Sequence, residues 1–220
     1  MGLIAYRTAD GSEVESFAVA PSTWNAMRRE PSGTYRMPGT GTPAILKRSI
    51  RGLHFFAYRA GEGTGTTEPM TEAHAAAQIG LLREFRQMGL QAWVEHSGTG
   101  PAGERWQADV FCMVGDRKVA IEVQLAPQTL EEFEFRTARY MQSGVECYWI
   151  VSPARFMTFN RAVMNRTWRE RPHDFPYGKR PAAPNTPVLA LELGDERNPS
   201  ANNMRVAVFL LGAPPAPPTG

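Results

Sequence analysis

The sequence has little cysteine, no long apolar run and almost no net charge. Its 220 residues include only two cysteines, Cys112 and Cys147, which lie in apolar surroundings and form neither a C-x-x-C pair nor a disulfide framework. Two buried thiols in a reducing compartment are therefore expected. No apolar run approaches the roughly 20 residues that a membrane-spanning helix needs, and the first residues lack the regions of a signal peptide. We expect a cytoplasmic protein without a membrane partner.

The residues that are present are typical of a globular chain. At 42% hydrophobic and 21% charged, the composition excludes wholesale disorder and collagen-like repeats. Lys and Arg number 24 against 22 Asp and Glu, so the formal net charge is +2, which by itself does not indicate a nucleic-acid partner. The length predicts one domain, or one domain with a small appendage, at roughly 100–200 residues per domain.

Composition and periodicity divide the chain into four parts. Residues 1–68 alternate short apolar runs with turn-rich spacers, which predicts a small β-rich region without helices. Residues 69–152 carry the regular patterns of a folded core. Residues 153–211 form a basic and aromatic extension with two further strands, and residues 212–220 are a Pro-rich tail, disordered or in a polyproline II conformation.

The core is predicted to follow the order α-β-β-β-α-β. A helix from Met70 to Gly89 is indicated by apolar residues at helical spacing, and strands follow at 91–96, 105–114 and 118–125. Thr129 and Glu132 form a capping box that begins a second helix, which Gly144 ends. A strand at 145–151 completes the core.

Asp109 and Glu122 lie on neighbouring strands of the predicted core, and the hairpin turn decides whether they meet. With a two-residue loop at 115–116 the two carboxylates face each other, about 5 Å apart between their Cβ atoms. With the loop at 116–117, Asp109 faces Gln124, which points to the same side as Glu122 because the strand period is two. A three-residue loop places Asp109 opposite Val123 instead.

Two facing carboxylates repel each other, so the pair persists most easily if it binds a cation. Oxygen ligands of this kind suit Mg²⁺ or Mn²⁺, and such a metal can polarise a phosphoryl oxygen and activate water. The alternative is that both acids are ordinary solvent-facing strand residues. The residues alone leave both readings open.

The run WQADVFCMVGDRKVAIEVQLAPQTLEEFEFRTARYMQSGVECYWIV resembles the nuclease domain of the competence protein CoiA family, a branch of the PD-(D/E)xK nuclease superfamily. The similarity covers about residues 35–152. It departs from the family pattern at Ala126, where the family tends to have Ser, and at Gln78, which stands in a Lys position. The matching positions are Asp109, Glu122, Gln124, Gln128, Thr129, Glu132, Arg136, Arg139 and Tyr140, with Glu72 and His74 upstream.

The resemblance implies an α/β fold with a PD-(D/E)xK nuclease-like core, a mixed sheet flanked by helices. It also implies a catalytic set in which Asp109 and Glu122 bind Mg²⁺ or Mn²⁺ and the Gln124 amide orients a water. Glu72 would add a carboxylate, although a helix-start Glu is also favoured by the helix dipole, and His74 is a further candidate. The substrate-binding residues would be Arg136, Arg139 and Tyr140.

The N-terminal region resembles a zinc knuckle that has lost its ligands. Met37 and Thr40 stand where many family members have cysteines, and Tyr58 replaces the last histidine of the family's aromatic tetrad. Zinc needs thiolates or imidazoles in a tetrahedral array, so no structural zinc is expected. Apolar packing of Met37, Phe55, Phe56 and Tyr58 must then hold the knuckle.

A basic strip between residues 155 and 180 is a candidate surface for nucleic acid, although Arg136 and Arg139 on the capped helix are better placed. Seven basic residues stand there against Glu170 and Asp174, a local charge of +5 that leaves −3 for the rest of the chain. Interleaved aromatics suit phosphate contact combined with base stacking, while the alternative is a solvated loop that wraps the core. The residues concerned are Arg155, Arg161, Arg166, Arg169, Arg171, Lys179 and Arg180, with Phe156, Phe159, Trp168, Phe175 and Tyr177.

Two functions follow from these features. The first is a metal-dependent DNA nuclease linked to DNA uptake, recombination or repair. The second is a catalytically inactive DNA-binding or recombination-partner protein that keeps the nuclease fold, as the neutral Gln78 and the lost cysteines suggest. DNA is the partner in both.

Overall fold

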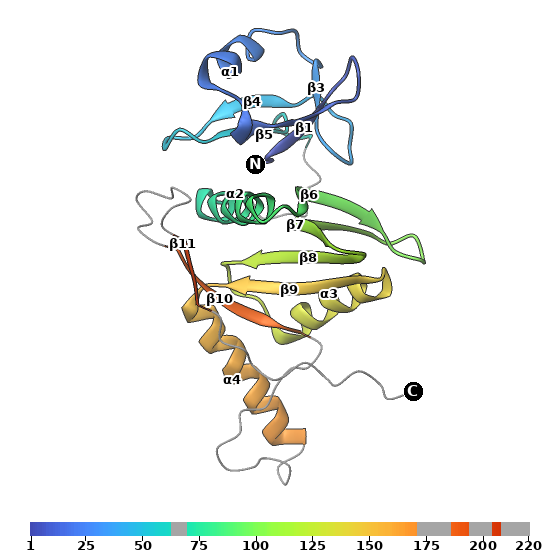
Figure 1. Ribbon diagram of the computed structural model, residues 1–220, viewed down its shortest axis with the longest axis vertical. Helices are drawn as coiled ribbons and strands as arrows, with labels where there is room; N and C mark the ends of the chain where they lie inside the picture. Colours follow the sequence, from blue (N-terminus) through green and yellow to red (C-terminus); the bar gives the residue numbers. More distant parts are fainter. Residues whose placement is uncertain (63–69, 171–185, 194–203, 208–220) are drawn as a thin grey trace. The chain divides into compact units, whose positions relative to one another are not determined.

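Figure 1 shows the computed structural model of the chain, which describes residues 1–62, 70–170, 186–193 and 204–207. The chain divides into two compact units, Met1–Ile79 and Gly80–Gly220, which are treated separately below. The predicted Pro-rich tail at 212–220 lies outside the described residues. In the part of the chain that the structure describes, none of the helices has the length and apolar character required to span a bilayer.

The N-terminal unit contains two small antiparallel sheets and a short helix. One sheet has the strand order β2-β1-β3, and the other is the hairpin of β4 and β5. The strands are β1 (Ile4–Arg7), β2 (Glu13–Glu15), β3 (Tyr35–Arg36), β4 (Ile45–Arg48) and β5 (His54–Ala57).

The prediction of a β region without helices is wrong, because a 3-10 turn η1 (Ser16–Ala18) leads to helix α1 (Pro21–Met27). Pro21 sits at the start of α1, where its fixed φ and missing N–H are tolerated. Trp24 and Met27, three residues apart on one face, bury that face in the unit's core.

The loop that resembles a zinc knuckle without its ligands is closed by backbone hydrogen bonds and apolar packing. The Met37 N–H donates to Thr42 O at 2.8 Å, and the Gly41 N–H donates to Met37 O at 3.0 Å. Met37 is buried with Phe56, and Tyr58 packs at the margin of the same core. A methionine thus fills, by packing, one of the positions where the resemblance places a cysteine.

The C-terminal unit is built on a six-stranded mixed sheet with the order β11-β10-β9-β8-β7-β6. Pairs β6–β7, β7–β8 and β10–β11 are antiparallel, whereas β8–β9 and β9–β10 are parallel. The strands are β6 (Gln91–Thr99), β7 (Arg105–Val114), β8 (Arg117–Gln124), β9 (Val145–Val151), β10 (Val188–Leu193) and β11 (Met204–Ala207). The predicted last strand extends beyond residue 207, outside the described part.

Helix α2 (Glu72–Gln87) precedes the sheet, and α3 (Leu130–Gln142) joins β8 to β9. The order α2-β6-β7-β8-α3-β9 is the α-β-β-β-α-β order that the patterns indicated. The capping box is present: Thr129 Oγ1 accepts the Glu132 N–H, and the Glu132 carboxylate accepts the Thr129 N–H. Gly144, at φ 68°, follows the helix in the left-handed conformation of a C-terminal cap.

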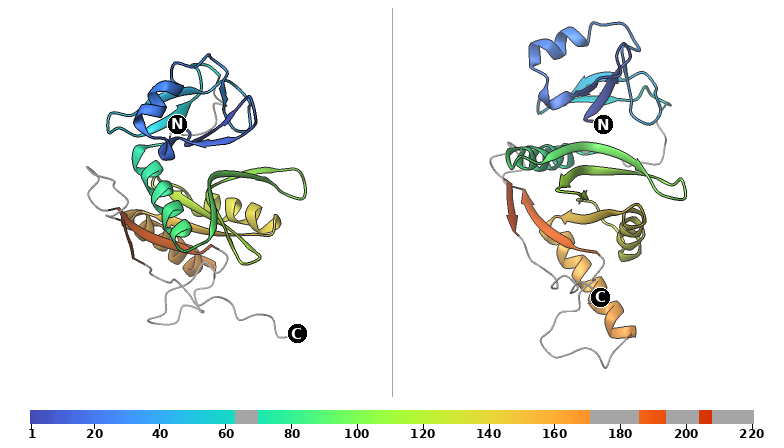
Figure 2. Two further views of the ribbon diagram at one scale, coloured as in Figure 1. Left: turned by 45° about the horizontal axis from the view of Figure 1, so that its top comes forward. Right: turned by 45° about the vertical axis from the view of Figure 1, so that its right-hand side comes forward.

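Helix α4 (Pro153–Glu170) was not expected, since the region was predicted to be a basic strip or a wrapping loop. Pro153 begins the helix, and Phe156, Phe159 and Val163 place one buried stripe against the core. Helix α3 packs against β9 and α4 against β10, as the ribbon views show (Figures 1 and 2). Phe133 of α3 meets both Trp149 and Phe159 edge to face.

The β7–β8 hairpin has the first of the three predicted registers. Val114 pairs with Arg117 across the loop at Gly115 and Asp116, and the pairing continues to Val110 and Ile121. Gly115 has φ 60°, as the first position of a type II′ turn requires. This register assigns Asp109 to the position opposite Glu122.

Candidate functional site

Asp109 stands where the ladder between β7 and β8 ends. The paired residues stop at Val110 and Ile121, although both strands continue beyond them. There the side chain of Asp109, rather than its backbone, joins the two strands: the Oδ2 atom of the half-buried carboxylate accepts the Val123 N–H of β8 at 2.7 Å. At the position where the register sets the two acids opposite each other, the Asp109 carboxylate is therefore hydrogen-bonded to the neighbouring strand.

Glu122 is the buried acid of the site. Its side chain is 1% exposed, and both of its oxygens accept hydrogen bonds from α3. Arg136 Nη2 donates to Oε2 at 2.5 Å, and the Tyr140 hydroxyl donates to Oε1. A carboxylate this deeply buried needs such partners, since an unpaired buried charge is costly.

Arg136 connects Glu122 to the rest of the site. Its guanidinium lies 4.6 Å from the centroid of the Trp149 ring, which is a cation–π contact. Its Nη1 also donates to Gln128 Oε1 at 3.3 Å and makes a long 3.5 Å contact with Gln124 Oε1. With 32% of its side chain exposed, Arg136 is the member of the pair that reaches solvent.

Tyr140 is predicted to bind substrate, but its side chain is fully buried. Its hydroxyl contacts both Glu122 and Gln107 O, the latter at 2.8 Å, and its single proton is shared between these acceptors. Burial raises the pKa of the Tyr140 hydroxyl, and the Glu122 charge raises it further. Tyr140 therefore holds Glu122 in place from inside the core.

Gln124 lies on the same side of β8 as Glu122, two residues further on. Its Nε2 donates to Ala126 O at 3.1 Å, while its Oε1 points toward Arg136. The amide is therefore held at both ends, and one of its two N–H groups remains for another acceptor.

The other predicted site residues are described by their own surroundings. Glu72 and His74 belong to the N-terminal unit, where Glu72 Oε2 is 3.7 Å from Arg51 Nε and the His74 backbone N–H donates to Thr71 Oγ1 at 3.2 Å. Gln78, in the family's Lys position, is fully buried. Arg139 is half-buried on α3, one residue before Tyr140.

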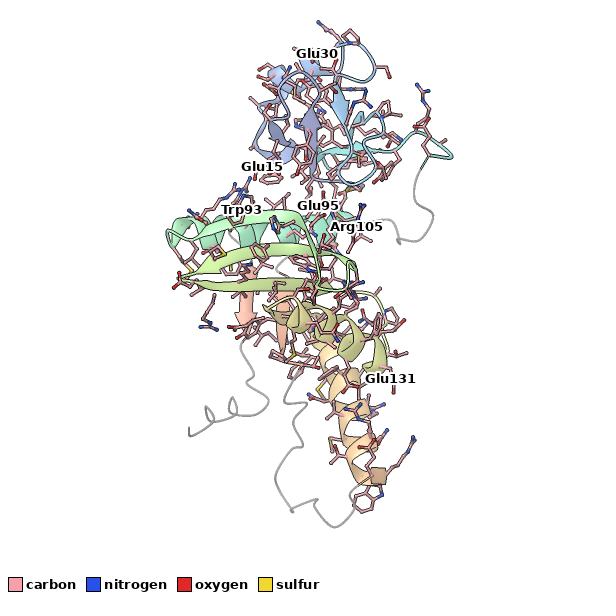
Figure 3. All side chains as sticks on the ribbon, turned by 90° about the vertical axis from the view of Figure 1, so that its right-hand side faces the viewer. Glu15, Glu30, Trp93, Glu95, Arg105 and Glu131 are labelled. Atoms are coloured by element: carbon pink, nitrogen blue, oxygen red, sulfur yellow. The ribbon has the colours of Figure 1, made fainter. Side chains whose placement is uncertain are left out.

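Sequence reasoning missed Glu95 of β6, which Figure 3 shows on that strand together with Trp93. The β6–β7 pairing runs through Val94–Val110 and His96–Ala108, so Glu95 occupies the position opposite Asp109. Its φ of 51° is left-handed and interrupts the strand's alternation. An acidic residue inside a predicted strand, on the strand next to Asp109, is the sequence signal that could have found it.

The donor set fits a magnesium ion in its chemistry. Asp109 and Glu122 offer hard carboxylate oxygens, the ligand type that Mg²⁺ prefers. Mg²⁺ is commonly held by one or two carboxylates and completes its shell with water and phosphate. Within the described ranges, no group of three or more Asp, Glu, His or Cys side chains is placed to hold a metal.

The first part of the predicted basic strip lies on helix α4, which fixes the surroundings of its side chains. Phe156 and Phe159 are buried in the core, so their predicted role in base stacking is wrong. Arg166 makes two hydrogen bonds to Glu134 of α3, at 2.5 and 2.6 Å. The remaining members of the strip from residue 171 onward lie outside the described residues, namely Arg171, Phe175, Tyr177, Lys179 and Arg180.

The mixed sheet, its flanking helices and the carboxylates at the β7–β8 junction are consistent with a nuclease-like α/β domain. Residues 71–171 match the family described as "Competence protein CoiA, nuclease-like domain". The match supports a CoiA-like family for this chain, with a nuclease-like domain at residues 71–171.

The chain was also compared with solved structures and with curated proteins. A solved structure titled "Crystal Structure of Protein of Unknown Function AF1548" is similar at 15% sequence identity and a TM-score of 0.29. That match covers 36% of this chain and 46% of the other, less than half of its length. No curated protein matches the sequence.

Proposed function

We propose that this chain is a metal-dependent nuclease of the PD-(D/E)xK type that hydrolyses phosphodiester bonds in DNA during uptake, recombination or repair. The observation that carries the proposal is the position of Asp109 and Glu122. They occupy facing register positions on adjacent strands where the β7–β8 ladder ends, and Gln124 follows on the same side. The match to the CoiA nuclease-like domain supports the same reading.

The chain's own residues divide the work as follows. Asp109 and Glu122 would hold Mg²⁺ or Mn²⁺, with Tyr140 keeping Glu122 in position. When bound, the ion supplies a Lewis acid that polarises a phosphoryl oxygen and lowers the pKa of water. The free N–H of Gln124 would orient the attacking water, because its other N–H is fixed on Ala126 O.

Arg136 is the residue that we propose to meet the phosphate. It has five N–H donors in a planar fork, and a third of its side chain reaches solvent. The donors that Glu122 and Gln128 do not use can bind a phosphate oxygen beside the carboxylates. Glu72, His74 and Arg139 are weaker proposals, because they rest on the family resemblance alone.

The test is a cleavage assay on plasmid, linear duplex and single-stranded DNA, with Mg²⁺, with Mn²⁺ and with a chelator. Asp109→Ala should abolish metal-dependent cleavage. Asp116→Ala is the matched control, since it removes an exposed aspartate from the turn of the same hairpin. Cleavage by a correctly folded Asp109→Ala variant at the wild-type rate would overturn the assignment.

A second candidate is a catalytically inactive DNA-binding or recombination-partner protein with the same fold. The observation that favours it is the Glu122–Arg136 pair, in which a guanidinium already neutralises the deepest carboxylate. Calorimetry separates the two candidates: DNA binding without Mg²⁺ uptake supports the second, and metal-dependent nicking excludes it.

A further inference from the structure

In the described part of the N-terminal unit, the longest stretch of sequence without an acidic residue is 31–61. It contains five basic residues and no acidic residue. Three of the five, Lys47, Arg48 and Arg51, fall on the hairpin of β4 and β5 and its turn, and all three are exposed. The charge is therefore concentrated at one projecting element of this unit (Figures 1 and 2).

The turn of this hairpin is held in one conformation. The Ser49 N–H donates to Leu53 O at 2.8 Å, the Gly52 N–H donates to Ser49 O at 3.1 Å, and the Leu53 N–H donates to Ser49 Oγ at 3.0 Å. Gly52 has φ 92°, which favours glycine. The basic side chains are thus presented on a fixed scaffold.

Ile50 stands at the tip of the turn, between Arg48 and Arg51, and its side chain is fully exposed. An isoleucine at a hairpin tip gives up the apolar burial that such residues usually gain. Arg51 is 3.7 Å from Glu72, a distant pair in which half of the arginine side chain remains exposed. The tip therefore combines an apolar side chain with flanking cations.

We infer that the β4–β5 hairpin is a DNA contact, with Lys47, Arg48 and Arg51 on backbone phosphates and Ile50 against the bases or sugars. Cations that neutralise phosphates supply most of the affinity for DNA, and apolar side chains inserted beside basic residues are a known means of contacting a DNA groove. The inference rests on the proposed function only for the choice of DNA as the polyanion.

The test uses the full chain in a chelating buffer, so that DNA binds without being cut. The anisotropy of a short fluorescent duplex gives the affinity across a salt series. Neutralising Lys47 and Arg51 as Lys47→Gln with Arg51→Gln should weaken binding and flatten the salt slope by about 0.9 for each lost phosphate contact. Arg28→Gln with Arg29→Gln, the same charge change at exposed positions of this unit, should leave the slope nearly unchanged.

Ile50→Ser removes no charge and no core contact, so it tests the tip without endangering the fold. It should weaken binding several-fold while the salt slope stays the same. Equal losses from the hairpin pair and the Arg28 pair, or no DNA binding at all, would overturn the inference. So would hairpin-dependent binding to vesicles of anionic lipid with none to DNA.

Failure of this inference can be told apart from failure of the proposed nuclease. Metal-dependent cleavage that disappears in Asp109→Ala, with binding indifferent to the hairpin, overturns the hairpin contact alone. Hairpin-dependent DNA binding without any cleavage overturns the nuclease alone.

Discussion

Among substitutions of partly exposed side chains in the C-terminal unit, Arg136→Ala should be one of the most destabilising, because it leaves the buried Glu122 charge without its arginine partner. Glu122 is 1% exposed and accepts hydrogen bonds from Arg136 and Tyr140. Removing the guanidinium takes a charged hydrogen-bond donor away from that carboxylate and leaves its negative charge buried. The contact with the Trp149 ring is lost in the same change.

The magnitude follows from the burial of the pair. Removing one partner of a fully buried ion pair costs about 3–5 kcal/mol. Because 32% of the Arg136 side chain is exposed, water partly replaces it, and the expected loss in the free energy of unfolding is about 2–4 kcal/mol.

Arg166→Ala is a close control. Arg166 is 34% exposed and also lies 2.5 Å from a glutamate, Glu134, but that glutamate is 37% exposed. The two arginines thus differ chiefly in the burial of their partners, and for Arg166→Ala we expect a loss of about 0.2–1 kcal/mol.

Urea unfolding followed by tryptophan fluorescence gives both values, provided that the slopes agree. The double variant Glu122→Gln with Arg136→Ala completes the cycle, since it removes the charge that was left unpaired. It should be more stable than Arg136→Ala alone. Equal losses from Arg136→Ala and Arg166→Ala, or a double variant no better than the single one, would refute the reasoning.

Three further outcomes are expected. Because the pKa of Tyr140 is raised in the folded protein, its contribution to the free energy of unfolding is intact below about pH 10 and falls as pH rises further, by up to about 1.4 kcal/mol per pH unit. Tyr140→Phe should therefore flatten the plot of urea midpoint against pH above about pH 10, and an unchanged slope contradicts this expectation. Gly98→Ala should cost about 1–3 kcal/mol, because a Cβ there would overlap the Trp106 ring; an unshifted melting temperature would show that the ring moves aside. Thr129→Ala should cost about 1 kcal/mol through the lost cap of α3, unlike Thr158→Ala within α4, and equal urea midpoints for the two would exclude a capping role.

The sequence alone was sufficient for the central core because its signals are local. The capping box at Thr129 and the glycine at 144 define α3, and the turn at Gly115 limits the hairpin to a few registers. Helices α1 and α4 were missed, although each begins with a proline and buries residues at helical spacing. In both places, a proline inside a turn-rich or basic segment favours a loop prediction, although proline is also common at the first position of a helix.

Part of the candidate site could be predicted from the sequence, and part of it depends on the tertiary structure. Composition and resemblance singled out Asp109, Glu122 and Gln124 as one chemical set, because strand period and hairpin register depend only on spacing along the chain. Only the tertiary structure decided what surrounds them, since α3 returns over β8 and β9 and brings Arg136 between Glu122 and Trp149. The burial of Glu122 and the role of Tyr140 inside the core depend on packing between distant segments, which spacing in a sequence does not encode.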